Sequence, residues 1–415
     1  MVISLALIGL GASGTFLALM REQLLPRIAQ VYVTCLALFG PAVVGCYALA
    51  QQVGFNAEEI FWDLGQLLNL VIIYLLLAVP FFLSGCAIGI ALMGWSENIP
   101  RLYSADLAGA GIGSLALMIA LTVVFPLQAL SLVALVGTCA LIVGLWELRL
   151  RWRPTPALIF ALIALPALAW PWRAELVVSP YKPLSLALQT AGAKVLEQRT
   201  GPLGLLTVVG NKVVPLRHAP GLSLHAPVGP PPQLGLYIDA GAVSPITAWD
   251  TTSRPGHFGQ LTSALPYYLA HPGRVLVLGA GSGSSVQQAL ALGADQVDAV
   301  ELNPQVTALV RDRFGAFTGD LFRNSRVRLH TGDARGFVTT DRGTYDLIQL
   351  DLIEALGASA AGLNALGENY LFTIEAMADY LGRLSPDGFL AITRWVRVPP
   401  RDALKLLATA AEALR

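Results

Sequence analysis

The sequence predicts a multi-span α-helical membrane domain followed by a soluble α/β domain. Of the 415 residues, 55% are hydrophobic and only 13% are charged, whereas soluble domains are about 25% charged. Charged residues are also sparse before residue 172 and frequent after it. The formal net charge is zero, so the composition gives no sign of a nucleic-acid partner.

Five or six apolar segments make up the predicted membrane domain, residues 1–172. Each segment is about long enough to cross a bilayer, which takes roughly 20 apolar residues. We therefore expect the lipid bilayer of an inner or plasma membrane as a partner. The expected spans are residues 2–20, 28–50, 67–93, 105–125 and 129–146, with a shorter sixth at 156–172.

Small residues recur every four positions along the fourth expected span, at Ala105, Gly109 and Gly113. Small faces let helices approach closely in lipid, so this pattern predicts helix packing. Asp106 opens the same span. It is interpreted as an interfacial cap, with a role in substrate passage as the alternative.

A linker and a small β segment are expected over residues 173–255. Between residues 184 and 250, short apolar runs alternate with Gly and Pro, which is typical of a small antiparallel element. Residues 218–233 are rich in proline and predict a loop. His218 and His225 lie in it without a Cys or acid at metal-ligand spacing, so we expect no metal site.

The next segment, residues 274–304, predicts a strand, a tight turn, a helix, a second strand and an acid. Glycines without Cβ atoms let the backbone approach a ligand, and a carboxylate about 20 residues later can accept ribose hydroxyls. This order is typical of a Rossmann-like domain. Its key positions are the alternating Gly279, Gly281 and Gly283, followed by the acid Glu301.

The residue after Gly283 is Ser284, so the turn reads G-x-G-x-G rather than the G-x-G-x-x-G of dinucleotide-binding folds. This difference favours an S-adenosyl ligand over NAD. A plain strand–turn–helix unit without a ligand is the remaining alternative.

The rest of the predicted Rossmann-like domain, residues 256–415, continues the alternation of strands and helices. We expect strands at 327–330, 345–350 and 389–395, with helices at 304–314, 368–382 and 401–415. A methyltransferase-type sheet normally closes with two more strands after the fifth. The domain is therefore expected to lack its last strands.

Acids follow two of these strands. Asp333, next to Ala334, follows the third strand and can accept the amino group of adenine, while Asp351 ends the fourth strand. Ligands of open α/β sheets bind at the carboxyl ends of the strands. Asp351 and the nearby Glu354 can hold an amine by charge and take its proton. The alternative is that Asp351 only caps a loop or contacts the adenosyl ligand.

From about residue 179 to 415 the chain resembles the spermidine synthases, or polyamine aminopropyltransferases. The resemblance rests on LALQTAGAKVLEQ, LYIDAGAV, QLTSALPYYLAHPGRVLVLGAGSGSS, VELNPQV, TGDARGFV and YDLIQLDLIE. In the apolar half, LALIGLGASGTF, VPFFLSGCAIGIAL and LYSADLAGAGIGSLA are similar to the membrane-bound members. The resemblance implies a transferase of polyamine biosynthesis. Such an enzyme moves an aminopropyl group from decarboxylated S-adenosylmethionine to a small, putrescine-like amine.

The resemblance also implies a role for each motif position. Asp351 matches the general base, and Glu354 matches a second acid that helps to hold the amine. The remaining matches form the nucleoside site, in the order glycine turn, ribose acid and adenine contact: Gly279, Gly281, Ser282, Gly283, Glu301, Asp333 and Ala334.

Three places depart from the family pattern. Ser282 stands where the family has an acid that holds the donor's amine, Phe258-Gly259-Gln260 replaces Tyr-Gln/His-Glu, and Ala355 replaces a proline. An S-adenosylmethionine-dependent methyltransferase is therefore the second hypothesis, favoured by Ser282 because its donor, S-adenosylmethionine, carries a carboxylate. A non-catalytic transporter or sensor that only binds a nucleoside is the third.

The charges around the spans predict the topology. Arginines follow the first, third and fifth spans, and the loop after the second is acidic, so the odd-numbered exits are expected in the cytoplasm. A sixth crossing would then put the nucleoside domain outside the cell, where S-adenosyl compounds are not expected. We favour a cytoplasmic nucleoside domain, in which case residues 156–172 do not cross the membrane.

Overall fold

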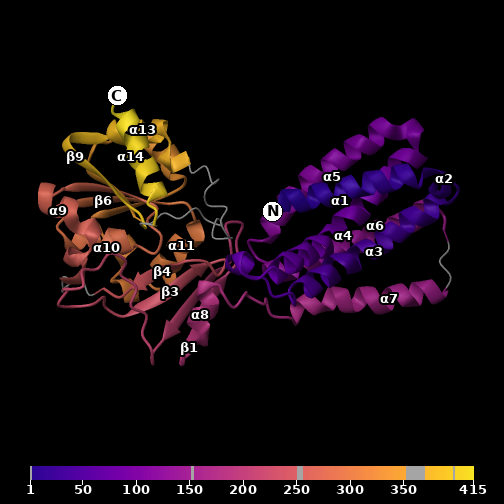
Figure 1. Ribbon diagram of the computed structural model, residues 1–415, viewed down its shortest axis with the longest axis horizontal. Helices are drawn as coiled ribbons and strands as arrows, with labels where there is room; N and C mark the ends of the chain where they lie inside the picture. Colours follow the sequence, from indigo (N-terminus) through magenta and orange to yellow (C-terminus); the bar gives the residue numbers. More distant parts are fainter. Residues whose placement is uncertain (1, 151–153, 250–255, 352–369, 396–397) are drawn as a thin grey trace. The chain divides into compact units, whose positions relative to one another are not determined.

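The computed structural model describes residues 2–150, 154–249, 256–351, 370–395 and 398–415. The chain divides into two compact units (Figure 1). The first is helical and comprises Met1–Ser179 with Thr200–Pro202. The second comprises Pro180–Arg199 and Leu203–Arg415 and holds both β-sheets.

All six predicted spans are helical. The helices of the first unit are α1 (Val2–Leu19), α2 (Arg21–Leu24), α3 (Ile28–Ala50), α4 (Gly65–Gly94), α5 (Ile99–Ala120), α6 (Pro126–Glu147) and α7 (Pro154–Ala169). Within the described residues, four helical stretches are long and apolar enough to cross a membrane: Arg21–Ala50, Gly65–Gly94, Ser96–Ala120 and Pro126–Glu147. The other two helices, α1 and α7, have 18 and 16 residues.

Small residues lie where helices of this unit pack side by side. A Cβ atom built on Gly9 of α1 would lie 2.7 Å from the carbonyl oxygen of Ala78 in α4. One built on Gly40 of α3 would lie 3.0 Å from the carbonyl oxygen of Ala134 in α6. Glycine therefore allows the backbones of these pairs to approach closely.

The small-residue face predicted for packing on α5 has no such neighbour. Cβ atoms built on Gly109 and Gly113 would meet nothing within 4 Å in the described part of the chain. No described residue of α5 is buried. The prediction of close packing by this face is therefore not met within the described chain.

The predicted antiparallel element is a four-stranded sheet in the order β1-β2-β3-β4. It follows the short helix α8 (Pro183–Gln189). Asp239 and Ala240, between the third and fourth strands, have positive φ angles of 50° and 58°, as a tight hairpin turn requires. The strands are β1 (Ala193–Arg199), β2 (Leu206–Asn211), β3 (Gln233–Ile238) and β4 (Val243–Thr247).

The second sheet has five parallel strands in the order β7-β6-β5-β8-β9. Numbered within the domain, the order is 3-2-1-4-5, which is typical of the Rossmann-like fold that was predicted. The strands are β5 (Arg274–Leu278), β6 (Gln296–Glu301), β7 (Val327–Thr331), β8 (Tyr345–Asp351) and β9 (Leu384–Thr393).

Helices cover both faces of the parallel sheet, which is the usual arrangement for parallel strands. One apolar core includes Val286 of α10 and extends to Leu236 and Ile246 of the small sheet. The other includes Val338 of α12 and Met377 of α13. The helices are α9 (Leu265–Ala270), α10 (Ser284–Ala291), α11 (Pro304–Ala308), α12 (Ala334–Thr340), α13 (Ile374–Leu381) and α14 (Arg401–Ala413).

Two of the differences from the predicted boundaries have a visible physical cause. Helix α13 begins at Ile374 rather than at residue 368, because the Thr373 hydroxyl accepts the N–H of Ala376 and caps the helix. Residues 385–388, just before the strand predicted at 389–395, lie inside β9. There the strand pairing shifts, from Leu384 opposite Tyr345 to Phe389 opposite Leu347. These residues therefore form a bulge in one longer strand.

Candidate functional site

The glycine turn between β5 and α10 has a backbone that favours glycine. Gly279, Gly281 and Gly283 have φ angles of 76°, 52° and 98°, in the left-handed region that L side chains rarely adopt. A Cβ atom on Gly283 would also lie 2.4 Å from Cδ2 of Leu321. The predicted role of these glycines in shaping the turn therefore has a steric cause.

Glu301 lies against this turn. Its carboxylate accepts the N–H of Gly281 at 2.8 Å and the N–H of Asn303 at 2.9 Å, and the residue is buried. Burial raises the pKa of Glu301, while the backbone N–H groups act in the opposite direction. A carboxylate has about four lone-pair sites, so it can still accept hydroxyl groups. The ribose contact itself stays a prediction.

Asp333 caps α12. Its Oδ2 accepts the N–H of Gly336 at 2.6 Å, and the hydroxyl of Tyr370 donates to Oδ1. This hydrogen bond raises the pKa of the Tyr370 hydroxyl. Ala334 is the first residue of the helix and is buried. The adenine contact predicted for Asp333 and Ala334 stays a prediction.

Asp351 ends β8 and joins three elements. Its Oδ2 accepts the Ser285 hydroxyl of α10 at 2.8 Å, and its Oδ1 accepts the Thr393 hydroxyl of β9 at 2.7 Å. The side-chain amide of Gln349 also donates to Oδ2. Three donors therefore hold the carboxylate in one orientation. The acid was predicted from the sequence, but none of these partners was.

A buried chain of polar side chains continues behind Gln349. The Tyr267 hydroxyl donates to Oε1 of Gln349 at 2.5 Å, and Nε2 of Gln349 donates to Oε1 of Gln288 at 3.0 Å. Burial, and then the charge of Asp351, raises the pKa of Tyr267 well above its usual value. Tyr267 is therefore a neutral donor. The sequence signal for this network is Gln349, a polar residue inside the apolar strand β8.

Ser282 attaches the turn to the small sheet. Its hydroxyl donates to the carbonyl of Pro245 at 2.6 Å and lies 2.8 Å from the hydroxyl of Ser244. The residue is only 3% exposed. Ser282 was predicted as a cofactor-binding residue. In the structure its side-chain hydroxyl is bonded to β4, and it brings no charge to the turn.

Of the other departures from the family pattern, residues 258–260 lie in the described part of the chain and Ala355 lies outside it. Phe258 is buried, and its carbonyl accepts the side-chain amide of Gln288 at 3.2 Å. Gly259 accepts the hydroxyl of Tyr268 at 3.2 Å through its carbonyl. This stretch therefore supports the polar chain behind Asp351. Glu354, the predicted second acid, lies outside the described residues.

The predicted site residues that the structure describes share one edge of the sheet. The glycine turn, Glu301, Asp333 and Asp351 follow or end the neighbouring strands β5, β6, β7 and β8. Carboxyl ends of parallel strands form the ligand-binding edge of such sheets. Glu301 and Asp351 also bond to the same turn and helix, at Gly281 and Ser285. Among the described residues, no cluster of three or more His, Cys, Asp or Glu side chains is arranged to hold a metal.

Comparison with protein families identifies this region. Residues 256–393 match the family model described as "Spermine/spermidine synthase domain". Residues 256–393 are called the synthase domain after this match. The synthase domain contains the glycine turn, Glu301, Asp333 and Asp351, and it ends with β9.

Relatives of the synthase domain occur among curated proteins. The polyamine aminopropyltransferase of Korarchaeum cryptofilum is 32% identical over 89 residues, which are 21% of this chain and 28% of that protein. Polyamine aminopropyltransferase 2 of Hyperthermus butylicus is 29% identical over 126 residues, 30% of this chain and 39% of that protein. The chain thus spans less than half the length of these relatives.

A solved structure is also similar to this chain. Spermidine synthase from Thermotoga maritima aligns with 53% of this chain and 63% of its own, at 15% sequence identity and a TM-score of 0.32.

Proposed function

We propose that the chain is an integral-membrane aminopropyltransferase. It transfers an aminopropyl group from decarboxylated S-adenosylmethionine to a small amine such as putrescine. One observation carries the proposal: Asp351, held by three side-chain donors, lies at the carboxyl edge of a synthase domain and bonds to the helix that follows the glycine turn. The curated relatives named polyamine aminopropyltransferases support the reaction class.

The nucleoside part of the donor binds at the glycine turn in this proposal. Glu301 accepts the ribose hydroxyls with the lone pairs that Gly281 and Asn303 leave free. Asp333 accepts the amino group of adenine beside Ala334. These contacts would orient the donor without taking part in bond breaking.

Asp351 acts as the general base. The amine nitrogen forms a bond to the donor's aminopropyl carbon, the bond from that carbon to sulfur breaks, and methylthioadenosine leaves. Asp351 takes the proton that the amine loses, while Glu354 helps to hold the amine. Most of the rate enhancement would come from holding nitrogen and carbon in line. The Ser285 and Thr393 hydroxyls serve this purpose by fixing the carboxylate.

The membrane part of the proposal rests on length and composition. Four helical stretches in the described chain can cross a bilayer. We infer that they anchor the synthase domain to the inner or plasma membrane, with the domain in the cytoplasm. S-adenosyl compounds occur in the cytoplasm, so a cytoplasmic synthase domain would have access to its donor.

A methyltransferase that uses S-adenosylmethionine is the second candidate, and Ser282 favours it. The aminopropyl donor carries an amine where the family acid would bind it, but the Ser282 hydroxyl is neutral and bonded to β4. The donor of a methyltransferase carries a carboxylate at its amino-acid end and does not need that acid.

Asp351→Asn tests the catalytic proposal. The change removes the proton acceptor while keeping the shape of the side chain, so methylthioadenosine release should be abolished. Nucleoside binding should be nearly unchanged, because Asp351 is not among the proposed nucleoside contacts. Methylthioadenosine release is measured with decarboxylated S-adenosylmethionine and putrescine. Wild-type release by the variant would refute the role of Asp351.

Calorimetry with both donors separates the candidate functions. The proposal predicts tighter binding of decarboxylated S-adenosylmethionine than of S-adenosylmethionine, and the reverse order would favour the methyltransferase. Tight binding of either nucleoside without turnover of any amine would instead support a non-catalytic transporter or sensor.

A further inference from the structure

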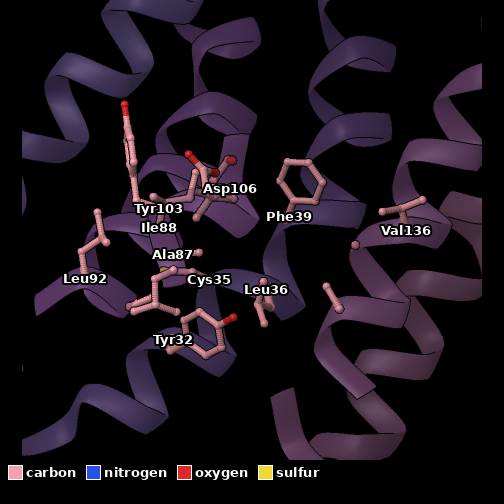
Figure 2. A pocket seen from close by; sticks show the side chains of 16 residues that line it. Tyr32, Cys35, Leu36, Phe39, Ala87, Ile88, Leu92, Tyr103, Asp106 and Val136 are labelled. Carbon is pink, nitrogen blue, oxygen red and sulfur yellow. The ribbon is translucent and has the colours of Figure 1, made fainter. Parts of the chain in front are cut away.

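A cavity lies within the helical unit, among α3, α4, α5 and α6 (Figure 2). Its volume is about 260 Å³, slightly below the range of roughly 300–1,000 Å³ for sites of drug-sized ligands. A ligand that fills it is therefore small. Most of its walls are apolar and include Leu36, Ile88, Leu92, Leu102, Val136 and Ala140.

Asp106 is the single charged residue among those that line the cavity. It lies seven positions after the start of α5 at Ile99, which is about 10 Å along the helix. It therefore lies inside the apolar stretch Ser96–Ala120, one of those long enough to cross a membrane. Its side chain is exposed in the chain, so the carboxylate is accessible to a ligand that enters the cavity.

The Asp106 carboxylate makes no hydrogen bond or ion pair with any residue that the structure describes. The other polar side chains of the lining include the hydroxyls of Ser84, Tyr32 and Tyr103. None of them carries a positive charge. The charge of Asp106 is therefore left for a cation from outside the chain.

Three aromatic residues also line the cavity. Tyr32 and Phe39 of α3 and Tyr103 of α5 are among its lining residues (Figure 2). The Tyr32 ring is held by an edge contact with Trp95, with ring centroids 5.8 Å apart. Aromatic faces beside a carboxylate are the groups with which proteins bind organic ammonium ions. A Ca²⁺ ion would need six to eight oxygen ligands, more than one carboxylate and three hydroxyls supply.

We propose that this cavity binds an alkylammonium ion, with the ammonium head at Asp106 and a short hydrocarbon chain along the apolar walls. The lining supplies one carboxylate, so it matches one positive charge. A diamine would bury its second charge against Leu and Val side chains, at a large cost. The site is separate from the synthase domain and does not depend on the function proposed for that domain.

Binding of hexylammonium to the detergent-solubilised full chain tests the proposal by calorimetry. Asp106→Asn removes the charge and should weaken binding about 10- to 100-fold, the range for a hydrogen bond to a charged group. Asp106→Glu keeps the charge and should retain binding. Affinity should also rise about fourfold for each methylene from butylammonium to hexylammonium, because each buried methylene contributes about 0.8 kcal/mol.

Two control variants test whether the ligand binds in this cavity. Glu147→Gln removes a carboxylate from α6 outside the cavity lining and should leave the affinity unchanged. Asp351→Asn alters the synthase domain and should also leave it unchanged. Loss of hexylammonium binding in Asp351→Asn would overturn the proposal by moving the ligand to the synthase domain.

Hexan-1-ol gives a test that needs no variant. It has the same hydrocarbon chain without the charge, so it should bind the wild-type chain at least tenfold more weakly than hexylammonium. Equal binding of the two compounds would overturn the proposal. So would wild-type affinity of hexylammonium for a folded Asp106→Asn variant.

Discussion

At the scale of single residues, the candidate site depends on how Asp351 is held. The acid itself was recognisable because it ends an apolar strand. Its partners were not, because Ser285 and Thr393 come from a helix and a strand far away in the sequence. Behind them, Tyr267 and Gln349 form a fully buried hydrogen bond. Buried polar networks of this kind contribute stability only while every member has a partner.

Tyr267→Phe should therefore destabilise the protein. The change leaves Oε1 of buried Gln349 without the Tyr267 hydroxyl, and an unsatisfied buried acceptor costs about 1–3 kcal/mol. Thermal unfolding of the detergent-solubilised chain measures the loss. The neighbouring Tyr268→Phe is a matched control. Tyr268 is 57% exposed, and its hydroxyl donates to the Gly259 carbonyl at the surface, where water can replace it, so the cost should be smaller. Equal effects of the two changes would contradict the role of the network.

A second prediction at this scale concerns His257. Its side chain is buried, and Nδ1 has no hydrogen-bond partner in the described chain. Burial lowers the pKa of His257 to about 4, from about 6.5 in the unfolded chain. Between these values the unfolded chain binds more protons than the folded one. Stability should therefore fall as the pH drops through this window, by an amount on the order of 2 kcal/mol.

His257→Phe should flatten this part of the pH profile, because it removes the group that must be neutral when folded. The measurement is the melting temperature of the full chain across the same pH window. His225→Gln changes an exposed loop histidine and should keep the wild-type slope. An unchanged slope in His257→Phe would show that other groups cause the acid sensitivity.

At the scale of elements, the turn between β5 and α10 organises the site. It bonds to Glu301 on one side, and the helix that it starts bonds to Asp351 on the other. Its glycine spacing was readable from the sequence because left-handed backbone positions favour glycine. The hydrogen bonds between Ser282 and β4 could not be predicted from the sequence, because they depend on how the small sheet packs against the turn.

Gly283→Ala should destabilise this turn more than Gly293→Ala destabilises the end of α10. Both glycines have similar positive φ angles, 98° and 102°, so both changes cost about 1–2 kcal/mol in backbone strain. Only at Gly283 would the new Cβ also clash, at 2.4 Å from Leu321, whereas nothing lies within 4 Å at Gly293. Unfolding temperatures and nucleoside affinity should both fall further for Gly283→Ala. Equal losses would mean that packing against Leu321 does not constrain the turn.

At the scale of the whole molecule, the chain combines a helical unit with a unit built from two sheets. Composition predicts a helical membrane domain before the sheets, because hydrophobic runs long enough to cross a bilayer differ from the short runs of strands. The sixth expected span is the shortest. Helix α7 has 16 residues, so it is about 24 Å long. The hydrocarbon core of a bilayer is about 30 Å thick.

Alkaline phosphatase fused after Arg173 should consequently be inactive, because the enzyme needs export and the synthase domain is proposed to be cytoplasmic. The arginines before α7, Arg149, Arg151 and Arg153, favour the same side. A fusion after Gly54, in the acidic loop that follows α3, should be active and serves as the control. Alkaline phosphatase activity of the fusion at Arg173 would contradict the cytoplasmic location of the synthase domain.

The sequence by itself determined the order of the elements, the turn and the acids at the strand ends. These depend on local spacing, which hydrophobic periodicity and glycine chemistry make visible. Only the tertiary structure decided what surrounds those acids and where Asp106 lies. Ser285 and Thr393 are 66 and 42 positions away from Asp351, and the cavity at Asp106 needs four helices. Contacts of this kind arise from packing between distant segments, and no local pattern encodes them.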